Sequence, residues 1–224
     1  LTGTTNHQKY GSPAAANSRM KEAVSETCGY VLTYRGDVFQ AYFSSTCGGN
    51  TTPVYDYYNE PKIPPLSGNT CGYCAREAPS EYVQWDVSYS RETVQKKLRG
   101  YFLSRNRKIG TVTAIEPVAK LGDVYPPSFT VVHTQGKASL SSLALKSLFG
   151  LKSQGVVLCK VWKDEVLFRG HGFGHGFGMC QYGSNGMAKA GKDFSKILYH
   201  YYPEAALTKV WKKQKMHEAA MPAK

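Results

Sequence analysis

The chain has 224 residues, of which 42% are hydrophobic, and this is enough to bury a core of its own. Its formal charge of +12 favours an anionic partner, such as nucleic acid, an acidic membrane surface or an anionic wall polymer, although a basic surface can also serve solubility alone. No run of about 18 apolar residues is present, which excludes a membrane-spanning helix within this sequence.

The first elements in chain order are a short helix and a hairpin. Asn17 or Ser18 can cap a helix that continues to Thr27. Two β-rich runs then flank Arg35-Gly36, a pair that favours a tight turn. These runs cover residues 30–34 and 37–43.

A segment rich in Gly, Pro, Asn and Tyr follows over residues 44–66, and we expect a long ordered loop of the kind that is functional or pinned by a metal. Further strands are expected over residues 82–88, 109–119, 128–134, 156–161 and 165–168, and helices over residues 90–100, 140–149, 179–190 and 194–201.

The irregular alternation of strands and helices, with recurring hairpins, predicts an α+β fold with mixed, largely antiparallel sheets, short helices and two lobes around a groove. We expect a single domain over residues 1–211 and a basic tail over residues 212–224. Because the sequence begins with Leu1 rather than Met, we also expect a processed or trimmed piece.

The most informative stretch begins at Gly170, where five glycines alternate with aromatic or imidazole side chains as far as Gly178. Glycine loses the most backbone entropy on folding, so such a series predicts that something approaches the backbone closely. Four side chains are expected around that approach: His171, His175, Gln181 and Tyr182.

This run does not fit a nucleotide site. The dinucleotide fingerprint needs Gly-x-Gly-x-x-Gly between a strand and a helix of a parallel unit, whereas these glycines alternate strictly and their flanking strands form a hairpin. No Lys-Ser or Lys-Thr follows, which excludes a P-loop. His171 and His175 have the spacing of two zinc ligands on a helix, but the glycines disfavour a helix there, so a hydrogen-bonding role for His175 is preferred.

Two segments near the C-terminus resemble a known family. Gly-His-Gly-Phe-Gly-Met-Cys-Gln-Tyr-Gly at 174–183 and Ile-Leu-Tyr-His-Tyr-Tyr-Pro at 197–203 are similar to the C-terminal signature of the stage II sporulation protein D family. Earlier segments follow the order of that family: Gln8-x-Tyr10-Gly11, Val-Leu-Thr-Tyr at 31–34, Ala-Tyr-Phe at 41–43 and Ser-Ser-Thr-Cys-Gly-Gly-Asn-Thr at 44–51. The resemblance covers most of residues 8–210.

The resemblance implies a lytic transglycosylase of bacterial peptidoglycan, or a relative of the amidase enhancers, that works outside the cytoplasm. In such an enzyme one carboxyl group protonates the glycosidic oxygen and then acts as base while the 6-hydroxyl attacks the anomeric carbon, which leaves a 1,6-anhydro end. The family's catalytic glutamate lies on a helix ahead of the Gln-x-Tyr segment. None of the glutamates in this sequence matches it, so the general acid is unknown and is expected upstream of Leu1.

The resemblance also implies a groove in which small residues let a sugar approach backbone amides, while other side chains hydrogen-bond to the glycan or stack on it. Local turn hydrogen bonds and a core position for the tyrosine are the structural alternatives. The residues expected in this groove are Ser45, Gly48, Gly49, Thr51, His175, Gln181 and Tyr182.

Cysteine spacing predicts a metal site. If Arg35-Gly36 closes a tight hairpin, Cys28 lies near the level of Phe43, and Cys47 lies just beyond the same end. The Cys-x-x-Cys knuckle at 71–74 then completes a four-sulfur set of the kind that holds structural zinc. The predicted ligands are therefore Cys28, Cys47, Cys71 and Cys74.

Alternatives to this ligand set remain. Family members often carry histidine where Ser44 stands, which leaves the fourth ligand to Cys28 or His7. Disulfides are an alternative to zinc because the family works outside the cytoplasm, and free thiols are another. Cys159 is expected in the core, and Cys180 as a buried small residue rather than a nucleophile.

The leading hypothesis is a cell-envelope protein that binds and cleaves peptidoglycan glycan strands. The alternative is a non-catalytic glycan-binding module that recruits or activates a cell-wall amidase. A nucleic-acid partner is disfavoured because the aromatic residues are scattered among strands instead of forming a basic and aromatic stripe.

Overall fold

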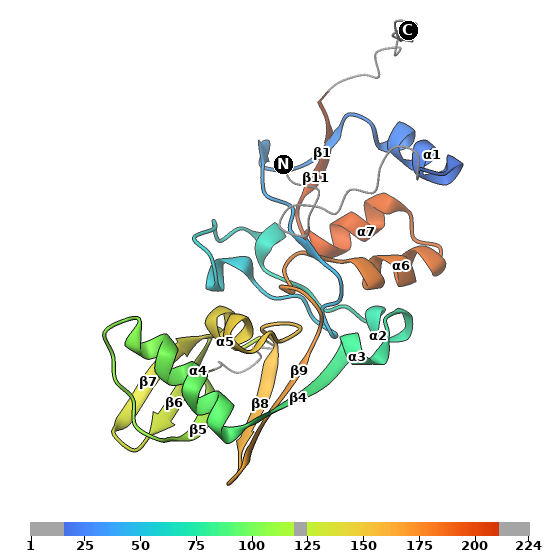
Figure 1. Cartoon of the computed structure of the whole chain (residues 1–224). Coiled ribbons are helices and arrows are strands. Elements are labelled where there is room, and N and C mark those ends of the chain that lie inside the picture. Colours follow the sequence, from blue (N-terminus) through green and yellow to red (C-terminus); the bar gives the residue numbers. More distant parts are fainter. Residues whose placement is uncertain (1–15, 119–124, 211–224) are drawn as a thin grey trace, which may run out of the picture. The chain divides into compact units, whose positions relative to one another are not determined.

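The computed structural model describes residues 16–118 and 125–210, which divide into two compact units (Figure 1). Among the described residues, one unit comprises 16–38 and 206–210, and the other comprises 39–118 and 125–205. Short helices accompany small, mostly antiparallel sheets, which confirms the predicted α+β class. The basic tail predicted over residues 212–224 lies outside the described residues.

The smaller unit begins with helix α1 (Ser18–Thr27), as the capping signal predicts. The side chain of Asn17 is the cap, because its Oδ1 accepts a hydrogen bond from the backbone N–H of Met20 at 3.0 Å. A three-stranded sheet follows in the order β11-β1-β2. Its strands are β1 (Tyr30–Tyr34), β2 (Asp37–Val38) and β11 (Ala206–Lys209).

The predicted turn of the hairpin is confirmed, but its second strand is shorter than predicted. Arg35 and Gly36 have φ angles of 52° and 94°, the left-handed pair that a tight hairpin requires. Pairing ends at Val38, and Phe43 belongs instead to strand β3 (Phe43–Ser44), which pairs in parallel with β10 (Met179–Cys180). Phe43 is therefore not paired across the hairpin towards Cys28.

The larger unit contains two antiparallel sheets, ordered β4-β9-β8 and β5-β6-β7, besides the β3–β10 pair. Its further strands are β4 (Gln84–Ser90), β5 (Val112–Val118), β6 (Ser128–His133), β7 (Gly136–Ser141), β8 (Val156–Val161) and β9 (Glu165–His171). Its helices are η2 (Val54–Asp56), η3 (Pro64–Leu66), α2 (Cys74–Glu77), α3 (Ser80–Val83), α4 (Arg91–Leu103), α5 (Ser142–Phe149), α6 (Gln181–Lys189) and α7 (Phe194–Tyr201).

The main core of this unit lies between the two sheets and helices α4 and α5. Helix α4 contributes Val94, Leu98 and Phe102, which recur every four residues and therefore face one side. Strand β6 alternates buried and half-buried residues, with Phe129 and Val131 turned inward. Each such side chain stabilises the fold by roughly 1.5–3 kcal/mol relative to an exposed one.

Tertiary packing shifts the ends of two predicted helices. Helix α4 continues past Gly100 to Leu103, because Phe102 is buried in the core. Helix α5 begins at Ser142 rather than at 140, because Leu140 is a buried residue of β7. No helix within residues 16–118 and 125–210 has the length and apolar character of a membrane span.

Candidate functional site

Four buried cysteine thiols lie together in the larger unit: Cys47, Cys71, Cys74 and Cys180. All four sulfur atoms are within 4.8 Å of one another, and those of Cys47 and Cys74 are 3.7 Å apart. Four thiolates at the usual zinc–sulfur distance of about 2.3 Å would be about 3.8 Å apart at the corners of a tetrahedron. All six cysteines of the chain are free thiols.

Three of these cysteines are those that the sequence predicted, but the fourth is not. Cys28 lies in the smaller unit and is not one of the four, whereas Cys180 is. The hairpin argument for Cys28 is wrong because the strand ends at Val38 and the chain then turns into the β3–β10 pair. That pair places Cys180 opposite Ser44, three residues before Cys47. The predicted alternative His7 lies outside the described residues.

Backbone hydrogen bonds hold the four sulfurs in place. The N–H of Cys71 donates to the carbonyl of Gly49 at 2.7 Å, which ties the knuckle to the turn after Cys47. Cys180 caps helix α6, and its sulfur accepts hydrogen bonds at 3.3 Å from the N–H groups of Gly183 and Cys47. Donors aimed at a sulfur stabilise its thiolate form, which is the form that ligates a metal.

The thiols perturb one another electrostatically. Hydrogen bonds with Cys180, Cys71 and Cys74, together with burial, raise the pKa of Cys47. Hydrogen bonds from Cys180 and Cys47 lower the pKa of Cys71, whose sulfur also lies 3.1 Å from the hydroxyl of Tyr201. A divalent metal ion that binds all four sulfurs would displace their protons, because a metal-bound cysteine is a thiolate.

The donor set fits a metal ion. Four buried thiols that can fill every position of a tetrahedron leave no place for a substrate or a reactive water, so an ion here would be structural rather than catalytic. The four thiols could thus bind a metal that pins the turn after β3 to helices α2 and α6.

Two glycines of α6 let this helix pack closely on the cysteine knuckle. A Cβ atom on Gly183 would overlap the hydroxyl oxygen of Tyr201 and approach the sulfur of Cys71 to 2.5 Å. A Cβ atom on Gly186 would lie 3.0 Å from side-chain atoms of Tyr73 and Glu77. Gly183 is therefore explained by packing against Cys71 and Tyr201, and Gly186 by packing against α2 and the residue before it.

The alternating glycines of residues 170–178, here called the glycine ribbon, are approached by the protein's own groups. Tyr125 is 1% exposed, and its ring lies within 3 Å of the Cβ positions of Gly155 and Gly176. Its hydroxyl donates to the carbonyl of Cys47 at 2.8 Å. Both Gly172 and Gly176 have positive φ angles, 78° and 75°. The group that approaches the glycine backbone is thus the buried side chain of Tyr125. Its hydrogen bond to Cys47 connects the glycine ribbon to the turn that carries this cysteine.

Several residues predicted for the groove have internal partners. His175 accepts a hydrogen bond at its Nδ1 from the N–H of Phe177 at 3.1 Å, and its ring also hydrogen-bonds to the backbone of Phe43. Thr51 is buried, and its hydroxyl bonds to the backbone N–H and carbonyl of Asn69. A Cβ atom on Gly48 would lie 2.6 Å from the N of Gly172.

The remaining groove candidates reach the surface. Gln181 is exposed, Tyr182 and Ser45 are half-buried, and space within 4 Å of a Cβ on Gly49 is open. The N–H of Tyr182 donates to the carbonyl of Ser45 at 3.2 Å, so these two residues are adjacent. The structure therefore brings Ser45 and Tyr182 together beside the thiol cluster.

Sequence reasoning missed the role of Cys180, although it lies inside the stretch that was singled out. The missing signal was the parallel β3–β10 pairing, which is long-range and has no local sequence mark. Cys159 is half-buried and packs against the main core, and burial raises the pKa of its thiol to about 12.

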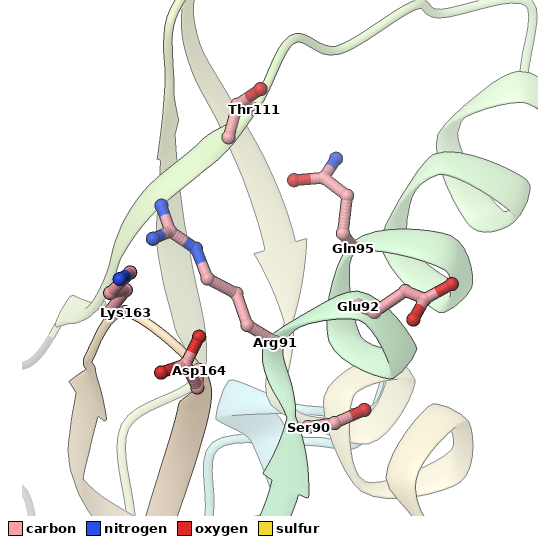
Figure 2. A pocket seen from close by; sticks show the side chains of 7 residues that line it. All are labelled: Ser90, Arg91, Glu92, Gln95, Thr111, Lys163 and Asp164. Carbon is pink, nitrogen blue, oxygen red and sulfur yellow. The ribbon is translucent and has the colours of Figure 1, made fainter.

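A pocket of about 420 Å³ lies away from these residues, at the start of α4 (Figure 2). Arg91 and Gln95 extend from the helix towards Thr111, which directly precedes β5. Arg91 donates to the carbonyl of Val112 at 3.0 Å, and the Gln95 amide bonds to the backbone at Gly110 and Val112. These hydrogen bonds connect helix α4 to the start of strand β5.

Comparison with known proteins indicates the class to which this architecture belongs. No family model matches the chain. An uncharacterized protein of Brachyspira hyodysenteriae is 28% identical over 90% of this chain. Stage II sporulation protein D of Bacillus amyloliquefaciens is 31% identical over 87% of the chain, and that of Bacillus subtilis is 29% identical over 82%. The amidase enhancer of Bacillus subtilis is 25% identical over 92%.

These relatives support the assignment of the chain to the stage II sporulation protein D family, which the sequence resemblance predicts. Their names support a function related to the cell wall. The chain spans about half the length of the first three relatives (49% to 53%) and 34% of the amidase enhancer.

Proposed function

We propose that this chain binds peptidoglycan glycan strands in the cell envelope and takes part in their cleavage as a lytic transglycosylase. The observation that carries the proposal is the cluster of Ser45, Gln181 and Tyr182 next to a buried four-thiol site, in a chain related to stage II sporulation protein D. Polar groups and an aromatic ring at one surface suit a sugar chain, which has both polar edges and apolar faces.

In this proposal the thiol cluster holds structural zinc. Its ligands are Cys47, Cys71, Cys74 and Cys180, and the ion supplies rigidity rather than chemistry. The turn that carries Ser45 is thereby fixed to the start of α6, which carries Gln181 and Tyr182. Elemental analysis of the purified full chain should find one zinc per chain, and a chelator that removes it should lower the melting temperature.

The cleavage step requires a carboxyl group that first donates and then accepts a proton. No general acid is assigned, because none of the glutamates of this sequence stands in the motif of the family. Around the cluster, Glu77 is engaged with Asn185 and Lys189 at 2.9 and 2.6 Å, and it serves to join α2 to α6.

A second candidate function is favoured by the relation to an amidase enhancer. In that role the chain binds glycan without chemistry and recruits or activates a cell-wall amidase. Binding residues are the same in both roles, so only the products distinguish them.

The test incubates the full-length protein with glycan strands that have been stripped of peptides and examines the products by mass spectrometry. Ends carrying 1,6-anhydro sugars are expected for the transglycosylase. Binding without such ends, together with faster peptide release when a cell-wall amidase is added, supports the second role. Failure to bind glycan at all contradicts both.

A further inference from the structure

A stacked pair of aromatic rings lies beside the glycine ribbon. The rings of Tyr82 and Phe173 are parallel within 10° and have centroids 4.5 Å apart, while Tyr182 meets Tyr82 edge-on at 6.4 Å. Phe173 is 37% exposed although one of its faces is covered by Tyr82. We call these three residues the aromatic platform.

The backbone holds the platform rigidly. The N–H of Gly172 donates to the carbonyl of Val83 at 3.0 Å, and the indole N–H of Trp85 donates to the carbonyl of Gly172 at 2.9 Å. Phe173 exchanges backbone hydrogen bonds with Thr46 at 2.8 and 3.1 Å. A ring that is fixed in advance loses little entropy when a ligand stacks on it.

A pocket of about 390 Å³ is lined by residues that neighbour Tyr82 in the sequence. Trp85, whose indole N–H donates to the carbonyl of Gly172, also lines this pocket. In the sequence, Tyr82 lies between Glu81 and Gln84, which line the pocket as well. The pocket offers hydroxyl, amide, carboxylate and guanidinium groups. Its lining consists of Ser80, Glu81, Gln84, Trp85, Asp86 and Arg169.

A positive charge lies at the same place. The ammonium group of Lys152 is 5.7 Å from the centroid of the Tyr82 ring and donates to the carbonyl of Glu81 at 2.9 Å. Arg169, by contrast, is neutralised by Asp86 at 2.6 Å. Lys152 thus places a positive charge beside Tyr82.

We propose that the aromatic platform and the pocket lined by Trp85 form a sugar-stacking subsite for a peptidoglycan glycan strand. A hexosamine ring places its apolar C–H face on the outer face of Phe173, directs its hydroxyl and amide groups into the pocket, and brings the carboxylate of a muramyl residue towards Lys152. This inference rests on the proposed function and adds Tyr82, Phe173 and Lys152 to it.

The experiment measures the affinity of the full-length protein for soluble, peptide-free glycan strands by calorimetry. Phe173→Ala and Tyr82→Ala should each weaken binding about tenfold. Phe173→Leu keeps an apolar side chain and should weaken it as well, which separates loss of stacking from a folding defect. Trp162→Ala removes another exposed aromatic, 47% exposed, and should leave the affinity unchanged.

Lys152→Ala is tested on two ligands, the muramyl-containing strands and a chito-oligosaccharide of equal length that lacks carboxylates. Binding should weaken for the strands only. Equal affinity of the wild type and both Phe173 variants overturns the subsite while the proposed function stands, whereas absence of binding by the wild type removes both. Binding of single-stranded nucleic acid with the same dependence on Phe173 overturns the glycan assignment.

Discussion

At the scale of single residues, Cys180 decides whether the thiol cluster is complete. With Cys180 replaced, only three sulfurs remain, and the hydrogen bonds from Gly183 and Cys47 lose their acceptor. We expect Cys180→Ala to reduce the bound metal to well below one equivalent and to lower the melting temperature by about 5 °C or more.

The matched control for that variant is Cys28→Ala. Cys28 lies outside the cluster, so its replacement should leave the metal content and the melting temperature nearly unchanged. Elemental analysis and thermal unfolding measure both. Loss of metal from Cys28→Ala, with retention by Cys180→Ala, would contradict the assigned ligand set.

His175 predicts a pH dependence of stability. Burial lowers the pKa of its imidazole to about 4, compared with about 6.5 in an unfolded chain. Between these values the unfolded chain binds a proton that the folded chain does not, so the contribution of His175 is fully present above pH 6.5 and is lost as the pH falls towards 4. Protonation would also remove the acceptor for the N–H of Phe177.

This dependence is measured by denaturant unfolding of the wild type and His175→Gln at pH 7 and pH 5. The wild type should lose more stability between the two values than the variant. Acid effects on the thiols are common to both proteins and cancel in the comparison. Equal losses would show that His175 is not the titrating group.

Sequence patterns predicted individual residues of the candidate site better than the residues that lie beside them in the fold. The Cys-x-x-Cys knuckle could be predicted because its spacing is local, whereas Cys47 was placed beside it by a hairpin argument that the structure does not follow beyond Val38. Cys180 could not be predicted, because its place depends on a strand pair between residues 43–44 and 179–180. The hydrogen bonds of His175 to the backbone of Phe177 and Phe43 could not be predicted either, because they depend on how the glycine ribbon folds.

At the scale of secondary structure elements, two helical glycines predict opposite effects of the same substitution. Gly100 lies inside α4, and a Cβ atom added there meets nothing within 4 Å. Gly183 lies inside α6 against Tyr201 and Cys71. Gly100→Ala should stabilise the protein by roughly 0.5–1 kcal/mol through helix propensity, whereas Gly183→Ala should destabilise it by roughly 1–3 kcal/mol through overpacking.

Equilibrium unfolding in denaturant measures both free energies in one series. Since the two substitutions add the same methyl group, differences in composition cannot explain a difference in sign. Two stabilising results would mean that α6 does not pack on the knuckle as described.

Local signals predicted helices and hairpins well and missed strands that depend on distant partners. The caps Asn17, Ser90 and Asp193 begin helices as expected, because each side chain bonds to a nearby backbone N–H. Strand β11 was missed, because it pairs with β1, which lies far away in the sequence. The end of strand β7 was taken for helix, because Leu140 continues the apolar pattern of the helix that follows it.

At the scale of the whole molecule, the formal charge of +12 predicts adsorption to anionic cell wall. We expect the chain to sediment with wall that carries its anionic polymers and to be released as salt rises, because exposed charges are screened over about 10 Å at 0.1 M. Wall stripped of anionic polymers is the control and should retain clearly less protein at low salt. Salt-independent retention on both preparations would assign adsorption to contacts other than charge.

The thiol cluster joins residue 47 to residue 180, near the two ends of the larger unit. Loops of that length close slowly, since chain entropy opposes contacts between distant residues. During synthesis all strands of the β4–β9–β8 and β5–β6–β7 sheets, which end at His171, emerge before Cys180, so the fourth thiol joins the cluster only after these sheets can pair. A nascent chain therefore carries an incomplete thiol cluster until Cys180 has emerged, and if the cluster holds a metal, stabilisation by that metal begins only then.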